Sequence, residues 1–255
     1  MSAIATSTPR RRGPLETRTF PIIEVFGPTI QGEGAEAGVP THFVRLGGCD
    51  YRCSWCDTMY AVDPDTIRKS ATRLSGLEVI EAVGRLAGAP RWVTISGGNP
   101  ALFPLDALVD GFHEAGLRVA VETQGSLWRP WLASVDRLTV SPKPPSSGMA
   151  TTSRIRRFND FMPQAVERAR DRMVLKIVCF DDADLAWAKA TAAAWPSLPL
   201  FLSAGTPVPS PGPVREAVGD RYAWLCEAVA ADPDLADVRV IPQLHVIAWK
   251  EATGV

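Results

Sequence analysis

From residue 20 onward, short apolar or β-branched runs alternate with stretches whose apolar residues recur every three or four positions. Between the runs, Ser75 and Glu78 form a capping box that predicts one helix start, and Gly116 is placed to end a second helix. Further helices are predicted at about 161–172, 182–195 and 213–231. The short runs predict strands at Phe20–Phe26, Thr41–Leu46, Arg91–Ser96, Leu117–Glu122, Arg137–Val140, Met173–Phe180, Leu198–Ser203 and Val238–Ile241.

Repeated strand–helix–strand units predict a mostly parallel sheet with right-handed crossovers. The strand count is near six after the opening segment. We therefore expect the α/β class and a partial, open (β/α)6-type barrel, because a closed eight-fold barrel typically needs about 250 residues of repeats alone. No long linker interrupts the pattern, which predicts a single domain over residues 20–255. Residues 1–19 begin with a segment that carries three consecutive arginines, Arg10–Arg12, with no apolar run behind them, and we expect a flexible basic tail rather than an export signal.

Composition narrows the class without indicating a function. Hydrophobic residues make up 46% of the 255 residues and charged residues 22%, which is ordinary for a soluble globular protein with a sizeable core. The 27 Lys and Arg offset 28 Asp and Glu to a net charge of -1, so nothing indicates a nucleic-acid partner. No apolar run approaches the ~18–20 residues that span a bilayer, and we expect a cytoplasmic protein without a membrane partner.

Three of the five cysteines lie within eight residues, as Cys49, Cys53 and Cys56 in a C-x3-C-x2-C spacing. This arrangement is a poor disulfide framework and indicates metal ligation in a reducing compartment. Thiolates suit iron–sulfur clusters, and three ligands on one loop leave the fourth iron of a cubane open for a substrate or cofactor. The alternatives are a structural zinc site, with His42 as a possible fourth ligand, and three unrelated free thiols.

Candidate chemistry gathers where the predicted strands end. The cysteine loop follows Thr41–Leu46, the Gly97-Gly98 turn follows the next strand, and Glu122 and Ser141 close two more. Ligands of parallel α/β sheets bind beyond the carboxyl ends of the strands. We therefore expect one site at this edge of the sheet.

The cysteine loop resembles that of the radical S-adenosylmethionine (SAM) superfamily, in which it follows the first strand of a partial barrel. The turn Ser96–Pro100 resembles the superfamily's glycine-rich strand end, although Asn99 stands where many members carry Glu. The resemblance implies a 4Fe–4S cluster on the three cysteines, with SAM chelated at the open iron. An electron from the cluster then cleaves SAM to a 5′-deoxyadenosyl radical, which abstracts hydrogen from the substrate.

Further segments, in the same order along the chain, resemble the 7-carboxy-7-deazaguanine synthase family of queuosine and 7-deazapurine biosynthesis. They are Glu24–Gly34, Phe43–Cys49, Glu122–Gly125, Ser141–Ser147 and Pro242–His245. Members are carbon–nitrogen lyases that convert 6-carboxy-5,6,7,8-tetrahydropterin into 7-carboxy-7-deazaguanine with loss of ammonia. The family regenerates SAM and is assisted by Mg2+.

This resemblance also implies roles for single residues, with no catalytic side chain beyond the cofactors. Thr58 is expected to bind Mg2+ through its hydroxyl oxygen. The expected contacts of SAM are Trp55, Cys56, Asp57, Gly98, Asn99, Ser141, Pro142 and Lys143. The expected contacts of the substrate are Ile30, Gln31, Gly32, Glu33, Arg45, Ser96, Glu122 and His245.

Some of these residues also have a plainer interpretation. Thr58 equally fits a turn hydroxyl, His245 a structural histidine, and Gln31–Gly34 a flexible turn. Arg45 fits a surface ion pair, although its otherwise apolar strand favours a buried role in which the guanidinium holds a carboxylate.

The resemblance implies a small pterin substrate, an electron donor such as flavodoxin or ferredoxin, and a homodimer. Two alternatives stay open at this point. A different radical SAM enzyme, such as a glycyl-radical activase, shares the cysteine loop but acts on a protein backbone. A non-enzymatic metal module would supply four protein ligands and would not cleave SAM.

Overall fold

The computed structural model describes residues 13–206 and 214–249 of the chain. Its strands are β1 (Thr19–Ile30), β2 (Pro40–Leu46), β3 (Thr72–Ser75), β4 (Trp92–Gly97), β5 (Arg118–Thr123), β6 (Arg137–Val140), β7 (Met173–Cys179), β8 (Leu200–Ala204) and β9 (Arg239–Ile241). Its α-helices are α1 (Pro14–Thr17), α2 (Pro64–Ser70), α3 (Gly76–Gly84), α4 (Asp106–Glu114), α5 (Thr152–Ala169), α6 (Asp182–Ala194), α7 (Val214–Ala230) and α8 (Leu244–Trp249).

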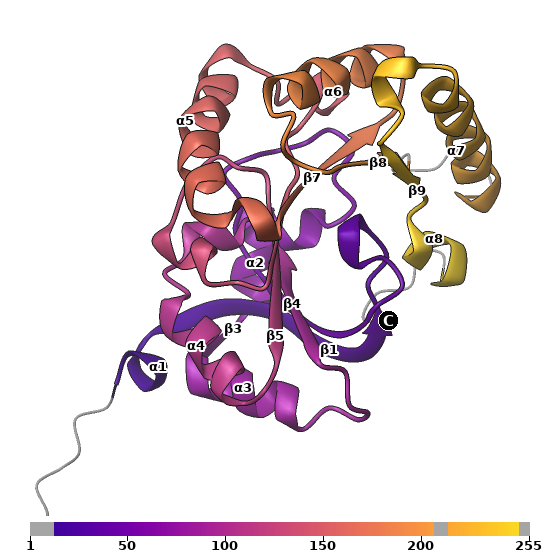
Figure 1. Ribbon diagram of the computed structural model, residues 1–255. Coiled ribbons are helices and arrows are strands. Elements are labelled where there is room, and N and C mark those ends of the chain that lie inside the picture. The colour runs from indigo at the N-terminus through magenta and orange to yellow at the C-terminus, as the bar shows by residue number, and fades with distance from the viewer. Residues whose placement is uncertain (1–12, 207–213, 250–255) are drawn as a thin grey trace, which may run out of the picture.

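Within these residues the strands form one nine-stranded sheet in the order β3-β1-β2-β4-β5-β6-β7-β8-β9. From β2 to β9 every neighbouring pair is parallel, whereas β1 runs antiparallel to both β2 and β3. Helices α3 to α7 lie around the outside of this open sheet (Figure 1). The expected α/β class and open, mostly parallel barrel-like sheet are confirmed.

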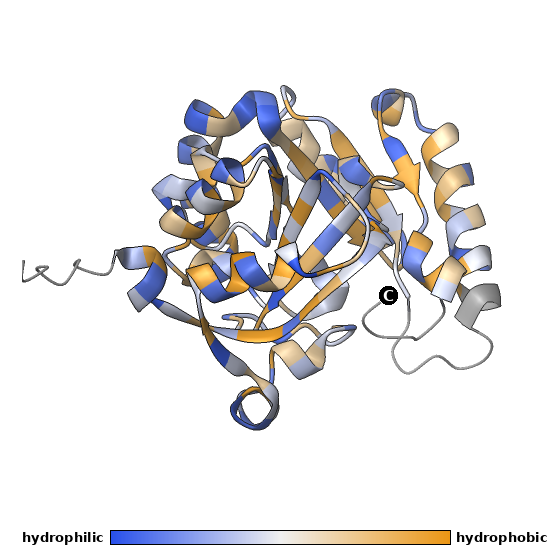
Figure 2. Ribbon diagram, turned by 90° about the horizontal axis from the view of Figure 1, so that it is seen from below, coloured by the Kyte–Doolittle hydropathy of each residue, from blue (hydrophilic) through white to orange (hydrophobic). Residues whose placement is uncertain are grey.

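The two faces of the sheet have opposite characters, because successive side chains of a strand point to opposite sides. On one face, residues such as Val44, Ile95 and Leu175 pack with the helices in a continuous apolar core. On the other face, which we call the inner face, small and polar residues such as Thr94 and Lys176 are buried. Figure 2 shows apolar residues along much of the strands, and both hydrophilic and apolar residues on the helices. The inner face is therefore the place for a polar ligand.

Local signals predict the helix ends well. Ser75 and Glu78 form the expected capping box at the start of α3, with the side chain of each accepting a hydrogen bond from the other's backbone N–H. Gly116 follows α4 with a φ of 78°, a left-handed conformation that favours glycine. Both predictions are confirmed, because caps depend on residues close together in the chain.

The structure corrects two element boundaries and adds one strand. The helix expected at 161–172 begins at Thr152, because its polar first turns and uncapped Thr151 give no start signal. The strand expected at Phe20–Phe26 continues to Ile30, since pairing with β2 resumes at Thr29 after an irregularity at Gly27-Pro28. The short edge strand β3 was not predicted at all, because four residues carry too little pattern.

The expected flexible tail of residues 1–19 lies largely outside the described residues. Its last part, however, is regular structure: Pro14–Thr17 is helical and β1 begins at Thr19. Leu15 lies against Gly76 of α3 and Gly111 of α4, so this short helix belongs to the folded unit. None of the described helices combines the length and apolarity that crossing a membrane requires.

Candidate active site

The cysteine loop leaves the carboxyl end of β2 and is held by backbone hydrogen bonds on both sides. The amide of Gly48 donates to Ala61 O at 2.8 Å, and the amide of Ser54 donates to Ser147 O at 3.0 Å. The loop also touches the turn after β4 so closely that a Cβ on Gly98 would stand 1.9 Å from Gly48 O. Only glycine fits at Gly98, which brings the glycine-rich turn directly against the cysteine loop.

The three thiols share one electrostatic environment. Burial is the largest influence on each and raises the pKa of Cys49, Cys53 and Cys56, that of Cys53 to about 11. The positive charge of Lys143 acts against burial and lowers the pKa of all three thiols. The backbone N–H of Tyr51 donates to Cys49 Sγ at 3.4 Å. A cationic side chain and N–H donors facing three thiols suit the anionic sulfurs of a bound cluster.

The donor set fits an iron–sulfur cluster better than zinc. His42, the possible fourth zinc ligand, lies on β2 toward the strand's amino half with its Nδ1 buried beside Gly27, whereas the cysteines follow the other end. Among the described side chains, no group of three or more His, Cys, Asp or Glu is placed to hold a metal ion. The case for a cluster therefore depends on the three thiols, their surroundings and the comparisons below.

Several residues expected to contact SAM lie beside the thiols. Lys143 Nζ donates to Ser141 Oγ at 2.9 Å and stands 5.9 Å from the centre of the Trp55 ring. The Trp55 indole N–H donates to Ser146 Oγ at 3.0 Å, and its ring packs 5.2 Å from that of Phe180. These contacts bring the loop and the strand end after β6 together, as the resemblance implied, while their roles toward SAM remain predictions.

Asn99 makes a different set of contacts from those expected of a ligand to SAM. The side chain is fully buried, and its Oδ1 accepts from Thr123 Oγ1 at 2.8 Å and Ala101 N at 3.2 Å. Its Nδ2 donates to Asp50 Oδ1 at 3.0 Å and Ser126 Oγ at 3.1 Å. Because protein groups engage both ends of the amide, any contact of Asn99 with SAM would involve its backbone.

Thr58 and Asp57 lie just beyond the last cysteine. The Thr58 hydroxyl donates to Asp57 Oδ1 at 3.1 Å and lies 3.9 Å from Cys56 Sγ. Thr58 precedes a short 3-10 helix, but its side chain makes no capping hydrogen bond there. The turn-capping interpretation of this hydroxyl is thus not realised, and the oxygen stands next to the cysteine loop.

A second polar group lies on the inner face around Lys176 of β7. Its side chain is only 2% exposed, and Nζ lies 2.5 Å from Glu33 Oε2 and 2.8 Å from Glu122 Oε1. Gln243 Nε2 donates to the other Glu33 oxygen at 2.5 Å. This Lys176 cluster therefore joins the loop after β1, the end of β5 and the segment before α8.

The charges in the Lys176 cluster are strongly coupled. Burial opposes ionisation of Glu33, but Lys176, His245 and the hydrogen bonds from Lys176 and Gln243 together outweigh it and lower the Glu33 pKa to about 2. Burial likewise opposes the charge on Lys176, yet the two carboxylates raise the pKa of its ammonium group. Two carboxylates and one ammonium leave a net negative charge, which suits a ligand edge that presents N–H donors.

His245 stands against the loop after β1. A Cβ on Gly32 would meet His245 Nδ1 at 2.5 Å, so glycine is required for this close approach. The backbone amide of Leu244 donates to Gly32 O at 3.1 Å. Gln31 Oε1 accepts the backbone N–H of Glu33 at 3.2 Å, which shapes the loop that starts at Ile30. The expected substrate residues of both segments are thus brought together.

Arg45 pairs with a carboxylate that the sequence did not suggest. Its Nε lies 2.5 Å from Glu24 Oε1, and its side chain is 15% exposed. The guanidinium stands between the rings of Phe26 and Tyr60, at 5.7 and 5.8 Å from their centres. Within the described residues, the terminal nitrogens of Arg45 have no hydrogen-bond partner and can still hold a ligand carboxylate. Ser96 lies opposite Arg45 in the β2–β4 pairing.

The end of β5 connects the two polar groups. Glu122 pairs with Lys176, Thr123 donates to Asn99, and Gln124 Nε2 reaches Asp50 Oδ1 at 2.6 Å. Sequence reasoning missed Lys176, Gln124 and Asp50. A signal existed for Lys176, since a lone lysine in the apolar run Met173–Phe180 must find a buried partner. Gln124 and Asp50 gave no comparable signal, because their contact depends on the fold.

The comparisons with known proteins show the family to which the chain belongs. No model of a known protein family matches the chain. A 7-carboxy-7-deazaguanine synthase from Bacillus subtilis is 40% identical over 243 residues, which cover 92% of this chain and 98% of the relative. The chain belongs to the 7-carboxy-7-deazaguanine synthase family. A family member from Thermoplasma acidophilum is 30% identical over 241 residues, which cover 92% of this chain and 99% of the relative.

A solved structure related to the family agrees on the fold. The crystal structure of QueE from Escherichia coli superimposes with a TM-score of 0.66, at 22% identity, over 90% of this chain and 96% of that chain. Membership of the synthase family favours a reaction on a small pterin over the glycyl-radical activase alternative. It also implies a 4Fe–4S cluster and SAM as cofactors, which the thiols and their surroundings fit.

Proposed function

We propose that the chain converts 6-carboxy-5,6,7,8-tetrahydropterin into 7-carboxy-7-deazaguanine with loss of ammonia, in 7-deazapurine biosynthesis. The observation that carries this proposal is the pairing of two features at one edge of the sheet. A three-cysteine loop follows β2, and the buried Lys176 cluster lies on the adjoining inner face. The end of β5 contacts both, so a cofactor and a small polar substrate can meet there.

The cluster and SAM supply the hydrogen-abstracting radical when they are bound. The chain's own part is to hold and orient. We assign the cluster to Cys49, Cys53 and Cys56, with the Lys143 cation facing their thiols. We assign SAM to the surface formed by Trp55, Asp57, Gly98, Asn99 and Ser141–Lys143.

The substrate is proposed to lie across the inner face. The lowered pKa of Glu33 keeps its carboxylate ionised, so it can accept hydrogen bonds from the N–H groups of the pterin edge. Glu122 and His245 flank this position, and Lys176 and Gln243 hold Glu33 in place. The terminal nitrogens of Arg45, which have no hydrogen-bond partner among the residues that the structure describes, are suited to hold the substrate carboxylate.

Turnover by the purified enzyme tests the proposal. The protein is reconstituted anaerobically with iron and sulfide, reduced, and supplied with SAM, Mg2+ and the carboxytetrahydropterin. We expect 7-carboxy-7-deazaguanine as the product, with SAM not consumed in proportion to turnover. An intact cluster that cleaves SAM without forming this product would contradict the proposal and would favour another radical SAM reaction.

The Thr58 hydroxyl gives a separate prediction. Replacing Thr58 with alanine removes a hard oxygen ligand of the proposed Mg2+ site. We expect half-maximal activity to need roughly tenfold more Mg2+, the effect of losing one ligand contact. The measurement is the dependence of turnover on Mg2+ concentration, with SAM affinity measured in parallel. Thr66→Ala at the start of α2 serves as control, since that hydroxyl bonds to Asp63. An unchanged Mg2+ response in Thr58→Ala would remove this residue from the metal site.

Four further features remain predictions, two from the resemblance and two from composition. We expect a one-electron donor such as flavodoxin or ferredoxin, a homodimeric assembly, a cytoplasmic location, and no nucleic-acid partner. Light scattering of the purified protein measures its oligomeric state. The rate at which each donor reduces the reconstituted cluster identifies the electron donor.

A further inference from the structure

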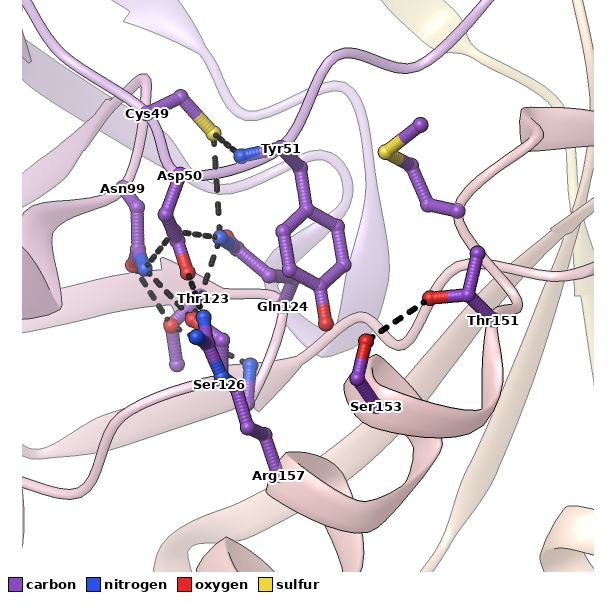
Figure 3. Close-up of polar contacts among 12 residues, drawn as sticks. Cys49, Asp50, Tyr51, Asn99, Thr123, Gln124, Ser126, Thr151, Ser153 and Arg157 are labelled. Atoms are coloured by element: carbon purple, nitrogen blue, oxygen red, sulfur yellow. Dashed lines mark hydrogen bonds and ion pairs between the residues drawn. The ribbon is translucent and has the colours of Figure 1, made fainter.

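The Asp50 carboxylate, between the first two cysteines, is held by side chains from two strand ends. Its Oδ1 accepts hydrogen bonds from Gln124 Nε2 at 2.6 Å and from Asn99 Nδ2 at 3.0 Å. On the other side, Arg157 of α5 lies 3.9 Å from Oδ2 (Figure 3). The Asp50 side chain is only 21% exposed, so its charge acts on its neighbours through little solvent.

Gln124 also reaches the first cysteine. Its Nε2 lies 3.8 Å from Cys49 Sγ, within the range of an N–H···S hydrogen bond, and the residue is 5% exposed. Nε2 also lies 3.4 Å from Ser126 Oγ, and since a side-chain amide carries two hydrogens, one can point to Asp50 while the other is directed toward the sulfur and this hydroxyl. With the Tyr51 amide at 3.4 Å, Cys49 Sγ has two N–H donors, whereas the described residues give Cys53 Sγ none.

Donors and charges near a cluster sulfur change the cluster's reduction potential in a known direction. Reduction adds a negative charge to the cluster and its thiolates, so an N–H donor stabilises the reduced form and raises the potential. A nearby carboxylate destabilises the reduced form and lowers the potential. Gln124 acts in both ways, because it donates toward Cys49 and partly neutralises Asp50.

We propose that Gln124 is a positioning residue that raises the reduction potential of the cluster, against the lowering effect of Asp50. This inference rests on the proposed cluster but on no step of the pterin reaction. Asn99 assists, because its side-chain amide donates to the same Asp50 oxygen. This hydrogen bond ties the turn after β4 to the cysteine loop.

Redox titration of two variants tests the proposal. Gln124→Met keeps the side-chain length but removes both N–H donors, and Asp50→Asn removes the charge. The midpoint potential of each reconstituted protein is measured by electron paramagnetic resonance, without SAM or substrate. We expect a more negative potential than wild type for Gln124→Met and a more positive one for Asp50→Asn. Gln164→Met, on the exposed side of α5, is the matched control and should not shift it.

Opposite shifts in the two variants support the proposal, since a merely structural role would not give two signs. Unchanged potentials with wild-type iron content and circular dichroism would overturn it. Should Gln124→Met fail to hold the cluster, Gln124→Asn takes its place, because the shorter amide withdraws from Cys49 Sγ. The same negative shift is then expected, and no shift overturns the proposal. Wild-type turnover of the pterin is measured separately, so failure of the proposed function stays distinguishable.

Discussion

Replacing Lys176 with methionine is expected to abolish turnover and to lower the free energy of unfolding by about 3–5 kcal/mol. The substitution leaves Glu33 and Glu122 on the inner face without the ammonium that now lies 2.5 and 2.8 Å from them. Burying an unpaired charge is the large effect, and repulsion between the carboxylates then moves both from their present positions. Thermal unfolding and steady-state turnover of the reconstituted protein measure the two losses.

A matched control separates this effect from the loss of any lysine. Lys189→Met removes an ion pair with Asp232 at 2.5 Å, but this lysine is 33% exposed. We expect a much smaller change in the free energy of unfolding there, because solvent screens this pair. The double variant Lys176→Met with Glu33→Gln should regain part of the stability but none of the activity, since Glu33 is proposed to bind the substrate. Wild-type stability in Lys176→Met would contradict the buried pairing.

The stability of Lys176→Met should also depend on pH in a specific way. In the wild type the Glu33 pKa is lowered to about 2, so its contribution is present above the usual value of 4.5 and is lost as the pH falls toward 2. The raised Lys176 pKa makes that contribution complete below 10.5 and lost only at higher pH. Without Lys176, burial raises the Glu33 pKa in the variant, so the difference between variant and wild type should be largest toward pH 10 and should shrink as the pH falls. A difference that grows below pH 4 would contradict the assignment.

Replacing Cys53 with alanine is the second large effect, and we expect no cluster and no turnover. Cys53 is the most buried of the three thiols, and the charges of both Cys49 and Cys56 raise its pKa. Two remaining thiolates cannot hold a cluster that already has an open iron. Iron and sulfide content after reconstitution measures binding, and product formation measures activity. Cys49→Ala and Cys56→Ala should behave alike.

The control for the cysteine variants is Cys226→Ser in α7, a half-buried free thiol outside the site. It should retain wild-type iron content and turnover. Full activity in any one of the three loop variants would remove that residue from the ligand set and leave the proposed cluster without its third thiolate.

Features that depend on residues close together in the chain could be predicted from the sequence. The cysteine loop, the capping box at Ser75 and the helix end at Gly116 all depend on local spacing. The sheet's parallel order followed from the alternation of strands and helices. The start of α5 and the edge strand β3 could not be predicted in the same way, because tertiary packing rather than local pattern stabilises them.

The candidate site was predictable by resemblance in its outline but not in its internal contacts. Glu33 and Glu122 were expected near the substrate, yet Lys176, which binds both, was hidden in a strand whose residues are all buried. Asn99 was expected at SAM, whereas its amide engages Asp50 and Thr123. Such contacts join segments far apart in the sequence, so only the fold reveals them.

The central claim is that three cysteines hold a 4Fe–4S cluster with one iron left for SAM. Electron paramagnetic resonance of the reduced, reconstituted protein, recorded before and after adding SAM, tests this most directly. We predict iron and sulfide matching one cluster and a clear change in its spectrum when SAM is added. A spectrum that SAM leaves unchanged, or a purified protein whose site holds zinc, would contradict it.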